Sequence, residues 1–448
     1  MRQGNDVAES TVTRQPAHLE KKATATLVLC SSPGIHDSQC IHEITAEVVL
    51  GRTPGNGGLG LNDPALSREH ARLNWHARHG LAQLEDLGSK NGTFVNGRRI
   101  TRTFLEDGDV LRVGDCLLVF RLIGEEVSGG EPSIPTLVGR SEVIRGLKRR
   151  LASIAPGSLP VLLTGEPGTG KELAARALHD LSGRTGPFRA LNCAAIPEGL
   201  FESVFFGHRK GAFTGAELDT FGVLREARGG TAFLDEVGEI PGTAQPKLLR
   251  FLQEGVVQPV GETREVLVDT RVVAATNADL ASAEVDGRFR SDLLARLEGV
   301  PIHLPPLRER REDIPLLLRH FAGRAGFELS SVDPDAMEAL MIAPWPRNVR
   351  GLATLVQRWT ETEWRGGEAH LSLDLVPSNL CDAVRTREEA ATAPSLSRQL
   401  RPSREELEDA LRRHHGVIQD VADELGKDRK QIYRWMERYG ITRETDSA

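Results

Sequence analysis

A glycine-rich loop, Gly165-Glu-Pro-Gly-Thr-Gly-Lys171, could bind phosphate groups. It follows the apolar run 161–164, which has the pattern of a strand, and precedes a helical pattern that begins at Glu172. In this context glycines let backbone amides turn toward phosphates, the helix N-terminus adds positive partial charge, and Lys171 can reach the β and γ oxygens. The candidate nucleotide ligands are Gly165, Glu166, Pro167, Gly168, Thr169, Gly170, Lys171 and Glu172.

Two adjacent carboxylates form a second signal. Asp235 and Glu236 end an apolar run that follows the turn Gly229-Gly230. Parallel α/β sheets place their ligands at the carboxyl ends of strands, so this pair is expected beside the glycine-rich loop. Asp235 can hold Mg²⁺, directly or through water, and Glu236 can polarise an attacking water. The alternative is a solvated strand end without chemistry.

A short segment, Gly211-Ala-Phe-Thr-Gly-Ala216, combines small residues with one aromatic ring and one hydroxyl. Its glycines favour a sharp loop. An exposed phenylalanine is costly unless it meets a partner. Either Phe213 and Thr214 form a contact surface at the tip of the loop, or Phe213 fills a core inside a buried turn.

The pattern of apolar residues changes along the chain and predicts several domains. Short strands with frequent turns come first, then strands alternating with helices, and then mainly helices. The predicted organisation is a disordered tail over 1–22, a β-rich domain over 23–124, a linker over 125–135, an α/β core over 136–307, a helical lid over 308–377, a second linker over 378–402 and a small helical domain over 403–443.

The composition excludes several classes of protein. The 448 residues are enough for about three domains with real cores. A formal net charge of −7 means that nucleic acid could be bound only by a local basic patch. The five cysteines show no CxxC spacing, which predicts reduced thiols and no zinc site. No apolar run is long enough for a membrane span, and the N-terminus lacks the pattern of a signal peptide, so we expect a cytoplasmic protein.

The central region resembles the AAA+ domain of bacterial sigma-54-dependent activators, also called enhancer-binding proteins. The hexapeptide GAFTGA is close to unique to that family, and a glutamate after the loop lysine is usual in it. The matching motifs are GEPGTGKE at 165–172, LNCAAIPEGL at 191–200, FGHRKGAFTGA at 206–216, GGTAFLDEVGE at 229–239, RVVAATNADL at 271–280, FRSDLLARL at 289–297, VPIHLPPLRERREDIPLLL at 300–318 and PWPRNVRGL at 344–352. The resemblance implies an ATPase with ATP and Mg²⁺ as cofactors.

The resemblance also implies individual roles around the nucleotide. Asn192 corresponds to the switch asparagine that holds Glu236 and senses the γ-phosphate. Thr276 and Asn277 correspond to the sensor I strand. Lys171 is still expected to reach the phosphates, Asp235 to hold Mg²⁺ and Glu236 to polarise the attacking water.

Further arginines match positions that complete the site in the family. Arg290 and Arg296 correspond to arginine fingers that one subunit donates to its neighbour, which implies a homo-oligomer, expected to be a hexamer. Arg350 corresponds to the sensor II arginine on the lid, and Val138 and Gly139 to the segment beside the adenine. At two lid positions the sequence departs from the family pattern: Arg347 and Gly351 stand where glycine and glutamate are usual.

The GAFTGA loop has a specific partner in the resembling family. There it projects from one face of the ring and engages sigma-54 and promoter DNA. The implied contact residues for sigma-54 RNA polymerase are Gly211, Ala212, Phe213, Thr214, Gly215 and Ala216.

The β-rich N-terminal region resembles the forkhead-associated (FHA) domain, an all-β sandwich that binds phosphothreonine peptides. The resemblance rests on Gly51-Arg52, on Ser67-Arg68-Glu-His70 and on Asn91-Gly-Thr, in that order. Arginine can fork onto phosphate oxygens, and asparagine can bind the peptide backbone. The resemblance implies that a phosphothreonine protein or a Ser/Thr kinase would be bound by Arg52, Ser67, Arg68, Lys90 and Asn91. His70 is expected to brace the loops from below.

The C-terminal region reads as three short helices and resembles the Fis-type helix-turn-helix. Its last helix, expected over Arg429–Arg438, enters the major groove in such motifs, and the segment from Lys427 to Arg438 has five basic and two acidic residues. Our candidates for contact with upstream DNA are Arg429, Lys430, Gln431 and Arg434. A helical hairpin used only for dimerisation is the alternative.

Together these observations predict a multidomain chain: an all-β FHA sandwich, an α/β AAA+ P-loop ATPase with a helical lid, and a small all-α helix-turn-helix. The expected function is that of a sigma-54-dependent activator regulated through phosphothreonine recognition. Two alternatives stay open: a phosphopeptide-binding scaffold with an inactive ATPase, and an AAA+ remodelling ATPase without a sigma-54 target.

Overall fold

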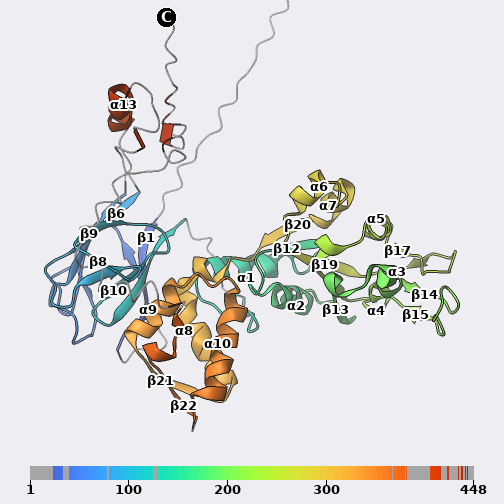
Figure 1. The fold of residues 1–448 in the computed structure, drawn as a ribbon, viewed down its shortest axis with the longest axis horizontal. Coiled ribbons are helices and arrows are strands. Elements are labelled where there is room, and N and C mark those ends of the chain that lie inside the picture. Colours follow the sequence, from blue (N-terminus) through green and yellow to red (C-terminus); the bar gives the residue numbers. More distant parts are fainter. Residues whose placement is uncertain are drawn as a thin grey trace, which may run out of the picture.

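The computed structural model describes residues 24–33, 40–77, 80–124, 130, 132–365, 367–378, 380, 404–414, 421–422, 432, 435–436, 439 and 441. Within them the chain forms a β-sandwich, an α/β core with a lid, and part of a small helical domain (Figure 1). The sandwich lies against the lid, and the core extends away from both (Figure 1).

The N-terminal domain is a sandwich of two sheets. One sheet has the order β2-β1-β11-β10-β7-β8 and the other β4-β3-β5-β6-β9. The strands are β1 Thr24–Ser31, β2 Cys40–Ile44, β3 Glu47–Gly51, β4 Leu59–Gly60, β5 Ala71–His76, β6 Leu81–Asp86, β7 Thr93–Val95, β8 Arg98–Ile100, β9 Arg102–Leu105, β10 Val110–Val113 and β11 Cys116–Ile123. Alternate residues point inward, and Leu27, Leu73 and Phe120 are among those fully buried between the sheets.

The ATPase core has a five-stranded parallel sheet in the order β13-β16-β19-β12-β20. The strands are β12 Val161–Thr164, β13 Phe188–Asn192, β16 Thr231–Asp235, β19 Arg271–Thr276 and β20 Val300–His303. Their apolar runs are nearly continuous because both faces are covered. In β16, for example, Phe233 packs on one face while Ala232 and Leu234 pack on the other.

Helices cover the two faces of this sheet. α1 and α2 contribute to the core on one face, and α3, α4, α5 and α7 to the core on the other. The helices are α1 Glu142–Ile154, α2 Lys171–Leu181, α3 Glu198–Phe206, α4 Val223–Glu226, α5 Gln245–Glu254, α6 Leu280–Val285 and α7 Ser291–Leu297. This is the α/β arrangement that the alternating pattern predicted.

Two small hairpins extend the core at the end remote from the sandwich (Figure 1). One pairs β14 Gly207–His208 with β15 Thr220–Phe221, and the other pairs β17 Val256–Val257 with β18 Val266–Leu267. The GAFTGA segment lies between β14 and β15.

The lid contains α8 Ile314–Arg324, α9 Pro334–Ile342 and α10 Asn348–Thr362. It also contains a parallel pair of strands, β21 Glu328–Val332 and β22 Glu368–Leu371, which the mainly helical pattern of the sequence did not predict. The sequence of β21, Glu-Leu-Ser-Ser-Val, has two adjacent serines and no strand alternation, and it becomes a strand by pairing with β22, about forty positions later.

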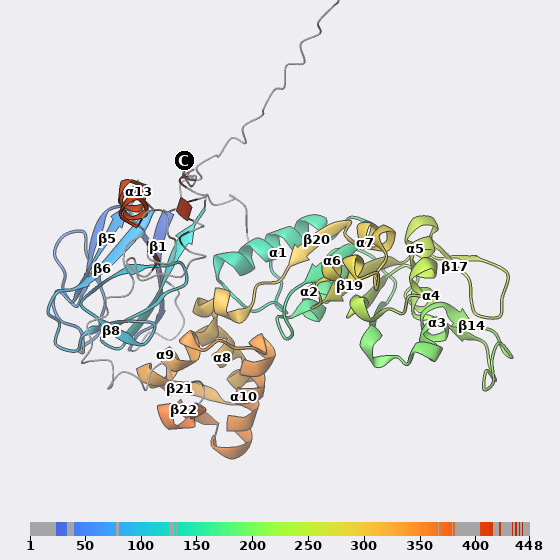
Figure 2. The same ribbon diagram turned by 45° about the horizontal axis from the view of Figure 1, so that its top comes forward.

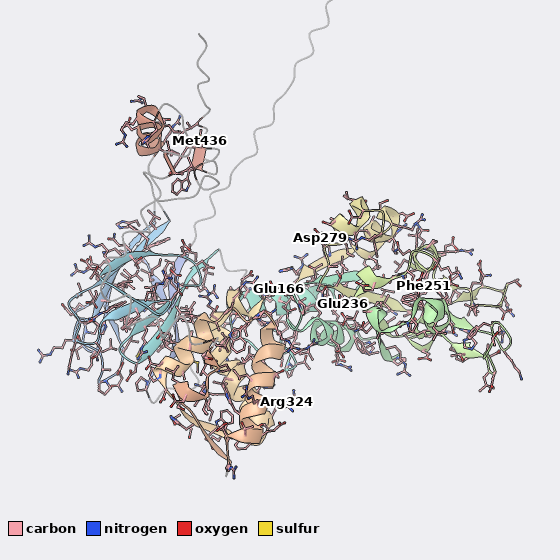
Figure 3. The ribbon with its side chains drawn as sticks, in the orientation of Figure 1. Glu166, Glu236, Phe251, Asp279, Arg324 and Met436 are labelled. Atoms are coloured by element: carbon pink, nitrogen blue, oxygen red, sulfur yellow. The ribbon has the colours of Figure 1, made fainter. Side chains whose placement is uncertain are left out.

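At the C-terminal end, α13 Arg404–Arg413 contributes Leu407 and Ala410 to a small apolar cluster. Trp435 and Met436 belong to the same cluster (Figure 3). The DNA-contact candidates Arg429, Lys430, Gln431 and Arg434 lie outside the described residues. Within the described ranges, no helix is both long and apolar enough to span a membrane.

Candidate functional site

A pocket of about 630 Å³ lies between the carboxyl ends of the parallel strands and the lid. The loop 167–172, the segment 135–138 and both carboxylates at the end of β16 line it. Glu166 and Glu236 lie where the core meets the lid (Figure 3). The lid contributes Arg310, Leu317, His320, Phe321, Arg324, Val349, Arg350 and Ala353. Of the expected adenine-side residues Val138 lines the pocket, whereas Gly139, whose carbonyl accepts from Lys148, does not.

The glycine-rich loop has the backbone that phosphate binding requires. Gly168 has a φ of +79°, and a Cβ placed on it would lie 2.3 Å from the Arg347 carbonyl oxygen. Only glycine allows the loop to pass so close to the lid. The helix α2 begins at Lys171, whose ammonium donates to the Gly165 carbonyl at 2.9 Å. Burial lowers the pKa of Lys171, and the nearby Glu236 and Asp235 carboxylates oppose that shift.

The carboxylate pair lies at the end of β16, as predicted. Asp235 accepts the Glu236 amide at 3.1 Å, and Glu236 adopts a left-handed backbone with φ of +53°. The Glu236 carboxylate is held by Asn277, through its backbone amide at 3.2 Å and its side-chain amide at 2.9 Å. Two hydrogen bonds fix the orientation of this carboxylate, and a fixed orientation is what a general base requires.

The partner of Glu236 differs from our expectation for Asn192. Asn192 lines the pocket, but its side-chain oxygen accepts the Ala194 amide at 2.9 Å and caps the short helix 193–195. The strand order explains the difference: β19, which ends just before Asn277, and β13, which ends at Asn192, flank β16 on opposite sides. Thr276 is buried and accepts the Ala278 amide, so it shapes the turn that presents Asn277.

The residues present fit a magnesium ion bound with a triphosphate. Such an ion needs one or two carboxylates and takes its other ligands from phosphates and water. Asp235 lines the pocket that Lys171 also lines. Among the described residues, no group of three or more His, Cys, Asp or Glu side chains could hold a metal ion alone.

The lid contacts the glycine-rich loop through residues that lie in matching motifs but to which the sequence analysis assigned no role. Arg308 donates to both Glu166 carboxylate oxygens, at 2.6 and 2.8 Å. Asn348, fully buried, donates to Glu166 at 3.1 Å and to the Pro167 carbonyl at 3.0 Å. The hydrogen bonds from Arg308 and Asn348 lower the pKa of Glu166 to about 2. Arg310 donates to the Thr169 carbonyl at 3.1 Å.

These lid residues gave only a weak signal in the sequence. The run Leu307-Arg-Glu-Arg-Arg-Glu-Asp313 lies within the matching motif at 300–318, to which we assigned no individual roles, and Arg310, Glu312 and Asp313 in it are buried. Arg350, which we did expect, lines the pocket, and its backbone amide donates to the Gly168 carbonyl at 3.3 Å.

The two candidate arginine fingers lie outside this pocket. Arg290 precedes α7 and pairs with Asp292 at 2.7 Å, and Arg296 is exposed in the last turn of α7. Neither lines the pocket of its own chain. Their exposure is compatible with donation to a neighbouring subunit.

The GAFTGA segment is a surface loop closed by its own backbone. The Gly211 amide donates to the Ala216 carbonyl at 2.8 Å. Phe213 is 39% exposed and packs edge-on against His208, with 5.0 Å between ring centroids. The alternative of a buried turn filled by Phe213 is therefore wrong. Arg209, at the base of the loop, forms ion pairs with Asp219 and Glu262.

Three loops of the sandwich bring the phosphothreonine-binding candidates together. The Arg52 amide donates to the Ser67 carbonyl at 2.9 Å, and the Ser67 hydroxyl accepts the Lys90 amide at 3.1 Å. Asn91 donates to the Ala65 carbonyl at 2.7 Å. The side chains of Arg52, Arg68 and Lys90 are exposed, so their charges are available to an anion.

Two residues hold these loops in place. His70 is fully buried and bridges the Ser67 amide to the Gly92 carbonyl, which is the bracing role we expected. Position 51 requires glycine, because a Cβ there would clash with the Arg68 carbonyl oxygen at 2.1 Å.

Four family models match the chain. They are the Sigma-54 interaction domain over residues 137–303, the FHA domain over 48–114, the AAA+ ATPase lid domain over 308–393 and the Bacterial regulatory protein, Fis family, over 402–439.

Curated proteins match half of the chain or more. The putative uric acid sigma-54-dependent transcriptional regulator UacR of Escherichia coli K12 is 42% identical over 327 residues, which are 69% of this chain and 55% of UacR. The transcriptional regulator NtrC of Rhizobium meliloti is 51% identical over 228 residues, which are 50% of this chain and 47% of NtrC. The chain thus spans about half the length of the curated relatives it matches.

Solved structures of NtrX from Brucella abortus, in complex with ADP and with ATP, are each 33% identical and match with TM-scores of 0.51 and 0.50. Each match covers 68% of this chain, with 70% of the ADP-bound chain and 69% of the ATP-bound chain.

Proposed function

Because this chain belongs to the sigma-54-dependent transcriptional regulators of bacteria, we propose that it is an ATP-driven activator that remodels the closed complex of sigma-54 RNA polymerase. One observation supports this most directly. A pocket with a phosphate loop and a carboxylate pair occurs in the same domain as an exposed GAFTGA loop.

The chemistry follows from the placement of the side chains. Lys171 binds the triphosphate, and Glu236, oriented by Asn277, takes part in activating the attacking water. Asp235 would hold the Mg²⁺, which neutralises charge on the phosphates. Arg290 and Arg296 of a neighbouring subunit complete the site, so the active species is a ring, which we propose to be a hexamer.

One continuous segment links the pocket to the loop. Asn192 lines the pocket, and the chain continues through the short helix 193–195 into α3. Ser203 on α3 hydrogen-bonds the His208 ring at 2.7 Å, and that ring packs against Phe213. A change around the γ-phosphate can therefore move α3 and the loop together. Gly211, Ala212, Phe213, Thr214, Gly215 and Ala216 are the proposed sigma-54 contact.

The N-terminal sandwich and the C-terminal helices would supply regulation and DNA binding. We propose that the loops of Arg52, Ser67, Arg68, Lys90 and Asn91 bind a phosphothreonine of a partner protein or kinase. The last C-terminal helix, with Arg429, Lys430, Gln431 and Arg434, is proposed to bind DNA upstream of the promoter. With these proposed partners, we propose that the protein acts in the cytoplasm.

A phosphopeptide-binding scaffold with an inactive ATPase is the competing function. ATP hydrolysis by the assembled protein separates the two: the wild-type chain hydrolyses ATP and Glu236→Gln does not. An assembled wild-type chain that binds ATP without hydrolysing it would favour the scaffold. A remodelling ATPase without a sigma-54 target is distinguished by transcription, because it would hydrolyse ATP and form no open complex.

A further inference from the structure

The sandwich and the lid share one hydrophobic core. Val110, Leu117 and Val119, on β10 and β11 of the sandwich, are fully buried in a cluster whose other buried members belong to the lid and the turn before it. The sandwich contacts α9 of the lid, and both views show them side by side (Figures 1 and 2). These strands therefore have two apolar faces, one for each domain.

Ion pairs also join the sandwich to the lid. Arg112 of β10 donates to Asp335 at 2.5 Å and to Glu338 at 3.1 Å, and both acids lie on α9. Arg121 of β11 donates to Glu312 at 3.0 Å. Glu338 and Glu312 are buried, so they depend on these arginines for compensation of their charge.

The contact of Arg121 with Glu312 involves the turn 309–312, which also lines the nucleotide pocket through Arg310. Arg121 also donates to the Glu309 carbonyl at 2.8 Å, so it binds both sides of Arg310, which holds the Thr169 carbonyl of the phosphate loop. Beside Glu312, Asp313 accepts the Ser141 amide at 2.8 Å and its hydroxyl at 2.6 Å.

We propose that this face of the sandwich is a docking surface for the ATPase lid and that docking holds the lid in its nucleotide-binding position. The sandwich contacts α9 at Asp335 and Glu338 and the turn 309–312 at the same time. It thus fixes the position of α9 relative to the turn 309–312. A chain whose lid is free spends part of its time in other positions, and its apparent affinity for nucleotide falls in proportion.

This inference rests on the proposed ATP site but not on phosphothreonine recognition. Its location does connect the two. Buried Asp63 accepts the amides of Ala65, beside the phosphothreonine loops, and of Asp115, in the β10–β11 turn. Arg112 donates to Gly114 in that turn at 2.9 Å. The peptide-binding end of the sandwich is therefore packed directly on the strand pair that holds the lid.

The test measures binding of a fluorescent ADP analogue to the full chain. Arg112→Glu faces Asp335 and Glu338 with a like charge, so we expect its dissociation constant to rise about fivefold or more. Arg102→Glu is the matched control: it makes the same reversal opposite Glu85, on a strand of the other sheet, and should bind like the wild type.

A rescue variant separates undocking from misfolding. In Arg112→Glu/Asp335→Arg the new arginine can pair with the new glutamate and with Glu338, one turn further along α9. We expect it to recover most of the lost affinity.

If Arg112→Glu binds the ADP analogue with wild-type affinity, or if the double variant recovers none of the lost affinity, the proposed docking of the sandwich on the lid is wrong. Failure of the wild type to bind the ADP analogue would instead overturn the proposed nucleotide site.

Discussion

Asn277 holds Glu236 through two hydrogen bonds, one from its side-chain amide at 2.9 Å and one from its backbone amide at 3.2 Å. The carboxylate that would activate water is therefore fixed from the end of β19. This relationship gives the first prediction.

Glu236→Gln should bind ATP and lose hydrolysis. The amide keeps the shape of the side chain but cannot act as a base, and we expect kcat to fall by about 10²- to 10⁴-fold. Asn277→Ala should lower kcat less, because the base stays in place but loses its orientation. Phosphate release measures the rate and analogue titration measures binding. A Glu236→Gln protein with wild-type kcat would exclude this residue as the base.

Arg290→Ala and Arg296→Ala should each lose ATP hydrolysis, by about 10³-fold or more if the arginine stabilises the transferred phosphoryl group. Mixing either variant with Lys171→Ala, which has intact fingers but a disabled pocket, should restore part of the rate. No recovery over the full range of mixing ratios would contradict donation between subunits.

Arg52→Ala should weaken binding of a phosphothreonine peptide by about tenfold or more, because a charge-assisted contact to phosphate is lost. The unphosphorylated peptide is the control for the ligand and Arg102→Ala is the control for the protein. Isothermal titration of the full chain measures both. Equal affinity for the two peptides would reject phosphate recognition.

Asn348→Ala should destabilise the chain by about 1–3 kcal/mol, because it leaves buried partners without their hydrogen bonds. Asn348 accepts the Leu307 amide at 2.8 Å and donates to Glu166 and Pro167. Thermal unfolding measures the loss, and Thr354→Ala on the exposed side of the same helix is the control. An unchanged Tm for Asn348→Ala would show that the lid is not held through this residue.

The local parts of the site could be predicted from the sequence. The phosphate loop and the pair Asp235-Glu236 are contiguous motifs at the ends of strands, and chain connectivity alone brings them near each other. The exposed loop around Phe213 could also be predicted, because its residues form one contiguous motif.

The contacts between distant segments could not be predicted. Arg308, Asn348 and Glu312 read as surface residues because charged and amide side chains are usually solvated. The burial of Asn348 and Glu312, and the ion pair of the exposed Arg308 with Glu166, depend on how the lid closes on the loop and how the sandwich packs on the lid. The expected contact between Asn192 and Glu236 has a similar explanation. Asn192 ends β13 and Asn277 follows β19, both strands lie next to β16, and only the side-chain geometry shows that Asn277 holds Glu236.

Open-complex formation at a sigma-54 promoter tests the central claim most directly. With sigma-54 polymerase, ATP and linear promoter DNA, the wild type should form heparin-resistant open complexes. Thr214→Ala should form none while hydrolysing ATP at the wild-type rate. Open complexes formed equally well by Thr214→Ala, or an ATP-hydrolysing wild type that forms none, would contradict the account.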